Sequence, residues 1–123
     1  MNNSQLSSAA KEMLARIKLK WEEALFIAQA LSILVITENA FESEGHYPGR
    51  VTKLIFSLKE CKQSSQQLVI DVKDFLESLE GKEKLEFLET SSNLLGGLDR
   101  AIHWADRNVA RSIGGPTVTF KQS

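Results

Sequence analysis

The residues best suited to chemistry lie near the end of the chain, on one face of a predicted helix. Basic and aromatic side chains recur there at spacings of three and four, which places them on one side of an α-helix. They are Arg100, His103, Trp104, Arg107 and Arg111. Arginines around a tryptophan suit an anionic ligand, a nucleic-acid backbone or a hot spot for another protein. We therefore treat these five residues, the basic face, as a candidate binding site.

The basic face also fits a purely structural role. If the first and third predicted helices run parallel, the third helix ends near the acidic residues Glu38, Glu42 and Glu44. Trp104 then packs on a neighbouring helix, and the arginines form ion pairs with those acids. The sequence leaves both interpretations open.

The other reactive side chains do not combine into a catalytic or metal site. The two histidines, His46 and His103, and the single cysteine, Cys61, are too far apart in sequence for a zinc site. Cys61 falls on the apolar face of a predicted helix, where a buried thiol behaves as a small hydrophobic group. No glycine-rich phosphate-binding loop precedes a helix. We predict no catalytic residue, no bound metal and no cofactor.

The composition is that of a globular protein with one domain. The chain has 123 residues, of which 42% are hydrophobic and 25% charged, as in ordinary domains. Its formal net charge of -1 argues against a general affinity for nucleic acid or anionic membranes. A single cysteine excludes an internal disulfide and fits a reducing compartment. The first residues lack a basic start followed by an apolar run, so we expect no secretory signal and a cytoplasmic protein.

Proline and glycine clusters divide the chain into three long segments with helical periodicity. Pro48 and Pro116 each lie beside glycines, and Gly81 marks a third break. Between the breaks, apolar residues recur at helical spacing. We predict helices over residues 8–43, 51–79 and 82–111, a turn over 44–50, a single domain over 1–113, and an extended or disordered tail over 114–123.

A seven-residue apolar repeat runs through the second and third predicted helices. Its members are Val51, Leu58, Ser65, Val72 and Leu79, then Leu88, Leu95, Ile102 and Val109. Such heptads joined by short connections predict an all-α, antiparallel up-down-up bundle with coiled-coil-like packing. The predicted core is Met13, Ile17, Ala24, Ile27, Leu31, Leu34, Leu54, Leu58, Leu68, Val72, Phe75, Leu88, Leu95, Leu98 and Ile102.

The most apolar segment is Ala24 to Ile36, which only Gln29 and Ser32 interrupt. It is too short to span a bilayer, which takes about 20 residues, and it has almost no polar side. Two further helices cover only one side of it. We therefore predict self-association, most simply a two-fold homodimer. The candidate contact residues are Leu25, Ile27, Leu31, Leu34 and Val35.

Three classes of function fit these features. The leading hypothesis is a small non-catalytic protein that acts by binding an unidentified protein, as a regulator, inhibitor, adaptor or immunity-type protein. The second is an oligomeric binder of an anionic ligand or nucleic acid through the basic face, although the negative net charge ranks nucleic acid behind a protein partner. The third is an enzyme whose site forms between subunits.

Overall fold

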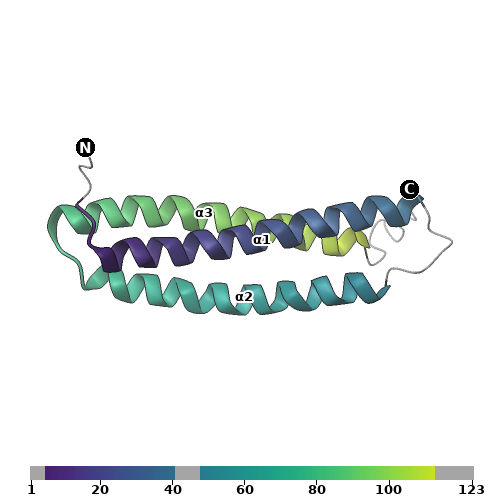
Figure 1. The fold of residues 1–123 in the computed structure, drawn as a ribbon, viewed down its shortest axis with the longest axis horizontal. Coiled ribbons are helices and arrows are strands. Elements are labelled where there is room, and N and C mark those ends of the chain that lie inside the picture. The colour runs from purple at the N-terminus through teal and green to yellow at the C-terminus, as the bar shows by residue number, and fades with distance from the viewer. Residues whose placement is uncertain (1–4, 41–47, 113–123) are drawn as a thin grey trace, which may run out of the picture.

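The chain forms three long helices in a computed structural model (Figure 1). The structure describes residues 5–40 and 48–112, with side-chain surroundings for residues 5–34 and 51–111. Helix α1 spans Ser8–Ala40, α2 spans Pro48–Glu77 and α3 spans Gly81–Ser112. The described residues include no strand. The predicted all-helical class with three long helices is therefore confirmed.

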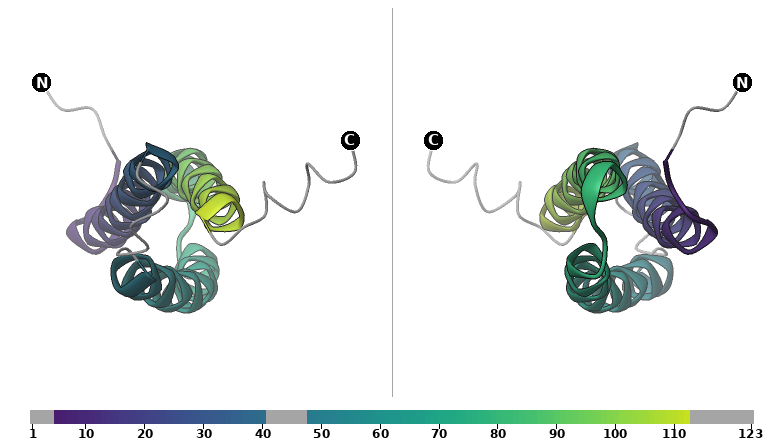
Figure 2. Two further views of the ribbon diagram at one scale, coloured as in Figure 1. Left: turned by 90° about the vertical axis from the view of Figure 1, so that its right-hand side faces the viewer. Right: turned by 90° about the vertical axis from the view of Figure 1, so that its left-hand side faces the viewer.

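The three helices lie side by side and pack against one another (Figures 1 and 2). The start of α1 lies against the start of α3, because the Ser7 backbone N–H donates to Glu83 Oε2 over 2.9 Å. The end of α2 lies near the same point, where Arg16 Nη2 is 3.0 Å from Asp71 Oδ2. Each helix therefore contacts both of the others.

Local hydrogen bonds and backbone preferences set the helix ends. Ser7 caps α1, because its hydroxyl oxygen accepts a hydrogen bond from the Ala10 N–H over 3.2 Å. Gly81 is the first residue of α3 and has φ of 62°, a left-handed conformation that glycine adopts without steric cost. Pro48 begins α2, where its missing N–H is harmless because the first N–H groups of a helix have no partner within it.

Several predicted boundaries need correction. The predicted turn over 44–50 is wrong for residues 48–50, which are helical because proline suits a first helical position. Helix α2 ends two residues before the predicted position, and α3 extends one residue further at each end. The predicted end of the first helix at 43 and the predicted tail over 114–123 lie outside the described residues.

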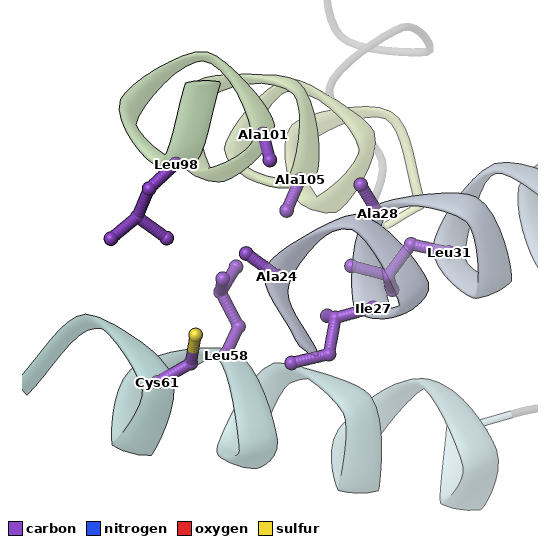
Figure 3. Close-up of a cluster of buried hydrophobic side chains, with 9 residues drawn as sticks. All are labelled: Ala24, Ile27, Ala28, Leu31, Leu58, Cys61, Leu98, Ala101 and Ala105. Carbon is purple, nitrogen blue, oxygen red and sulfur yellow. The ribbon is translucent and has the colours of Figure 1, made fainter. Parts of the chain in front are cut away.

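Helices α1 and α3 share the most extensive contact, and small residues line it. Ala24 and Ala28 of α1 lie near Ala101 and Ala105 of α3, and all four are buried (Figure 3). The distance between packed helices depends on the side chains at their contact, so alanine on both sides permits a close approach.

Gly97 extends this contact of small residues toward the middle of the bundle. A Cβ atom at this position would lie 3.0 Å from Trp21 Cε2, so glycine leaves the space that the indole ring occupies. At the neighbouring Gly96, the nearest heavy atom to a Cβ would be Arg100 Nη1 at 3.6 Å, an ordinary contact. The close helix approach therefore requires Gly97 and not Gly96.

A buried amide connects the same two helices. Asn108 is 1% exposed, and its Nδ2 donates to the Ala28 carbonyl oxygen over 2.9 Å. A buried polar side chain requires such a partner, because an unsatisfied amide is costly. This bond fixes how α3 is placed along α1.

Helix α2 covers the α1–α3 pair with larger side chains. Leu58 and Cys61 join one buried cluster with Ile27, which points toward α2 (Figure 3). Leu68 and Val72 join a second cluster nearer the start of α1. The predicted heptad residues over 51–79 are all buried, which confirms that repeat, although the last of them lies just after the end of α2; they are Val51, Leu58, Ser65, Val72 and Leu79.

Every predicted core residue is buried or half-buried except Leu88 on α3. Leu88 is 44% exposed, whereas its neighbour Phe87 is fully buried and packs edge-to-face on Phe75 with ring centroids 5.2 Å apart. Leu95 and Ile102 are half-buried at the margin of the core. The buried line of α3 contains the predicted core residue Leu98, together with Ser91 and Ala105. It also contains Phe87, Ala101 and Asn108, each one position before a predicted heptad residue.

Candidate interaction surface

The basic face of α3 divides into an exposed part and a half-buried part. Arg100, Arg107 and Arg111 are exposed. Trp104 is half-buried and packs against the cluster that joins the three helices. The tryptophan therefore contributes to the core, and the arginines alone form an accessible basic surface.

His103 is occupied within its own helix. Its Nδ1 lies 2.9 Å from the Asp99 carbonyl oxygen and 3.4 Å from Asp99 Oδ2. The side chain is nevertheless exposed, with 65% of its surface accessible. His103 therefore lies exposed on the basic face, with its Nδ1 beside Asp99 of the same helix.

The ion pairs between described residues do not include the three arginines of the basic face. Those pairs join Arg16 to Asp71, Lys20 to Glu23, and Lys62 to Asp106. The proposed acidic partners Glu42 and Glu44 lie outside the described residues, and the surroundings of the Glu38 side chain are not described. The structural interpretation of the basic face therefore stays a prediction.

Most of the residues predicted for self-association lie inside the chain's own core. Ile27 is 3% exposed, Leu31 is fully buried and Leu34 is 8% exposed. Leu25 is half-buried against the same cluster, and Val35 lies outside the residues with described surroundings. In the single chain, Ile27, Leu31 and Leu34 therefore fill the bundle and do not form an open surface.

A different row of α1 presents apolar side chains to solvent. Leu19 is 65% exposed, Phe26 is 66% exposed and Ile33 is 63% exposed. These three residues, the apolar row, are seven apart in sequence and so lie along one line of the helix. A heptad count outside the core positions could have found them. The predicted contact residues of α1 follow its inward-facing side, so this row was not among them.

Two hollows between α1 and α2 adjoin the ends of the apolar row. The Ile33 hollow has a volume of about 400 Å³ and is almost entirely apolar; it is lined by Ala30, Ile33, Leu34, Lys53 and Leu54. The Leu19 hollow has a volume of about 300 Å³ and is lined by Arg16, Leu19, Lys20, Glu23, Ser64 and Leu68. Helices pack when projecting side chains of one enter the spaces between side chains of the other, and this face of the chain has both.

A third hollow lies between α2 and α3, beside Ser65 of α2. It has a volume of about 230 Å³ and includes Ser65 and Leu98 in its lining. The Ser65 oxygen is buried and has no hydrogen-bond partner of good geometry. Burial and the negative charge of Glu23 raise the pKa of the nearby Cys61 thiol, outweighing the opposite effects of the Ser65 hydroxyl and Lys20. A raised pKa keeps the thiol protonated and a poor nucleophile near neutral pH.

No group of three or more histidine, cysteine, aspartate or glutamate side chains among the described residues is arranged to hold a metal ion. Within the same part of the chain, no helix is long and apolar enough to cross a membrane. Comparisons with protein-family models, with curated proteins and with solved structures found no match to this chain.

Proposed function

We propose that this chain is a small non-catalytic protein that acts by binding another protein, in a regulatory, inhibitory, adaptor or immunity-type role. The observation that carries the proposal is the apolar row of Leu19, Phe26 and Ile33 on the surface of α1. Large apolar side chains aligned on one exposed helix face favour an interaction site over a solvated surface. Exposed residues seven apart suit a helical partner laid along α1.

The proposal includes an antiparallel up-down-up bundle whose open α1–α2 side is completed by a partner helix. The proximity of the start of α1 to both the end of α2 and the start of α3 supports this arrangement. A cytoplasmic location is part of the same proposal. It is supported by the buried free thiol of Cys61, which suits a reducing compartment.

Site-specific photo-crosslinking in living host cells tests the proposal. A photoreactive phenylalanine analogue at Phe26 should yield covalent adducts with protein, because this side chain lies at the centre of the apolar row. The same analogue at the exposed Asn93 of α3 is the control. Equal labelling at both positions, or no adduct at position 26, would contradict a protein-binding role for the row.

The exposed arginines of α3 support a second candidate function, the binding of an anionic ligand or nucleic acid by an oligomer. Arg100, Arg107 and Arg111 share one face and are outside every ion pair between described residues. Binding of a fluorescent oligonucleotide should weaken as salt rises, because phosphate contacts release counterions. The Arg107→Ala chain should bind less tightly with a shallower salt dependence. Equal binding by both chains would remove this candidate.

A further inference from the structure

We propose that the Ile33 hollow binds a small amphipathic anion, a carboxylate attached to a short alkyl chain. The alkyl chain lies in the hollow between α1 and α2, and the ammonium group of Lys53 binds the carboxylate. This ligand site goes beyond the protein-binding role proposed above, because it needs no second protein. Either proposal can fail without the other.

The walls of the Ile33 hollow suit an alkyl chain. Leu34 is buried, and Leu54 packs against the core cluster that joins the three helices, so the fold holds both in place. Ile33 lines the same hollow and is 63% exposed. The volume of about 400 Å³ lies within the range of about 300–1,000 Å³ that is typical of small-ligand sites. An alkyl chain in the hollow therefore removes apolar surface of both molecules from water.

Lys53 gives the Ile33 hollow a charge of one sign. Among the described residues that line this hollow, Lys53 is the only charged one. It belongs to no ion pair between described residues, and its side chain is exposed. An ammonium group beside apolar walls attracts a carboxylate and repels a cationic head group. The hollow therefore complements an apolar chain that ends in a carboxylate.

The other two hollows lack this combination of apolar walls and one unpaired cation. Arg16 and Lys20 line the Leu19 hollow, but each already has an acidic partner. Lys62 and Asp99 line the hollow between α2 and α3, so that hollow contains charges of both signs. An amphipathic anion therefore has its best match in the Ile33 hollow.

The first measurement is a titration of the full chain with octanoate below its micelle concentration, followed by methyl NMR. The signals of Ile33, Leu34 and Leu54 should shift and saturate, whereas that of Leu68 in the Leu19 hollow should stay in place. From hexanoate to octanoate, the affinity should rise by up to about fourfold for each added CH₂ group that is buried. The absence of saturable shifts, or larger shifts at Leu68, overturns the proposal.

Substitution of Lys53 tests the carboxylate contact. Lys53→Gln should weaken octanoate binding by up to about fivefold, the scale of an exposed ion pair, and should leave the binding of uncharged octanol unchanged. Lys59→Gln is the matched control, because Lys59 is also exposed on α2 but does not line the hollow. Octylammonium should bind the unchanged chain more weakly than octanoate does. Equal octanoate binding by both variants, or tighter binding of octylammonium, overturns the proposal.

A larger side chain in the hollow tests where the alkyl chain lies. Ala30 is half-buried and lines the hollow, so Ala30→Leu should abolish the saturable binding of both octanoate and octanol. Ala15→Leu, at an exposed position of the same helix, is the control and should bind both, with circular dichroism showing that each variant folds. Unchanged binding by Ala30→Leu overturns the proposal. A chain that binds no octanoate but still yields protein adducts at position 26 in cells overturns the ligand site alone.

Discussion

Helix α1 contacts its two neighbours through interfaces of different kinds. Toward α3 it presents alanines. That interface also contains the Trp21 indole ring packed on Gly97 and the buried hydrogen bond from the Asn108 amide to the Ala28 carbonyl oxygen. Toward α2 it presents larger side chains, and this interface leaves two hollows and a row of exposed apolar residues along its margin. The α1–α3 interface leaves no space for larger side chains at its alanines or at Gly97. The second has unused apolar surface that another helix can cover.

The difference shows that helix contacts within one small bundle can serve separate purposes. Small residues that exclude other packings make the α1–α3 pair the rigid part of the fold. Helix α2 adds burial to that pair but does not complete the covering of α1. The proposed binding activity therefore lies where packing is incomplete.

The largest expected effect comes from adding volume at the α1–α3 interface, compared with the same change at the α2–α3 interface, which also contains a hollow. Ala101→Leu inserts a branched side chain between α1 and α3, and it should lower the free energy of unfolding by about 3 kcal/mol. Ser65→Leu adds similar volume beside the hollow of about 230 Å³ between α2 and α3 and removes a poorly bonded hydroxyl. It should change stability by less than about 1 kcal/mol. Urea denaturation of both chains measures this contrast, and equal losses would show that the two interfaces are equally tight.

The buried amide of Asn108 should have the next largest effect. Asn108→Ala removes the hydrogen bond to the Ala28 carbonyl and leaves a cavity, so the free energy of unfolding should fall by about 2 kcal/mol. Asn93→Ala, at an exposed position of the same helix, should stay within about 0.5 kcal/mol of the unchanged chain. Thermal denaturation followed by circular dichroism compares them. A loss at Asn93 as large as at Asn108 would show that the amide bond does not fix α3 on α1.

The adjacent glycines offer a smaller and more selective test of the α1–α3 contact. Gly96→Ala meets only an ordinary contact and should stabilise the chain by about 1 kcal/mol, because alanine favours the helix. Gly97→Ala places its methyl group against Trp21 and should be less stable than the Gly96 variant by about 1 to 2 kcal/mol. Denaturant midpoints of the two variants give the difference. Equal stabilisation would mean that the indole ring moves aside at little cost.

The smallest expected effect is a pH dependence caused by Cys61 on α2. Burial raises the pKa of this thiol in the folded chain, so folding favours the protonated form. Its contribution is complete below the unfolded pKa of about 8.5 and decreases by up to about 1.4 kcal/mol per pH unit above it. Stability should therefore fall as the pH rises above about 8.5, and Cys61→Ala should reduce the slope. The same slope in both chains would assign the dependence to other groups.

The sequence predicted the helices well because apolar periodicity and breakers act locally. The heptads of α2 identified its buried line, and Gly81 marked the turn before α3. Pro48 was assigned to a turn, although a proline at the first helical position is equally consistent with the sequence. That choice depends on how the chain enters α2, which periodicity does not determine.

The sequence was less informative about which apolar line of α3 lies inward. The prediction placed the buried Leu98 correctly but joined it to the larger residues Leu88, Leu95 and Ile102, of which Leu88 is exposed and the other two are half-buried. The structure buries the line with Phe87, Ala101 and Ala105, because its small residues allow close packing on the alanines of α1. The sequence likewise did not show which apolar residues of α1 are exposed. Only the inward position of Ile27 and Leu31 showed that the exposed apolar residues of α1 are a separate row.

The tight contact between α1 and α3 has a consequence for the order in which the chain folds. The Asn108 amide and the Ala28 carbonyl are separated by 80 residues in sequence. Contacts between distant residues form slowly, because a long loop must close before they contribute. Helical bundles usually fold quickly through contacts between sequence neighbours. In this chain the most extensive contact joins the first helix to the last, so we expect slower folding than its helical content alone suggests.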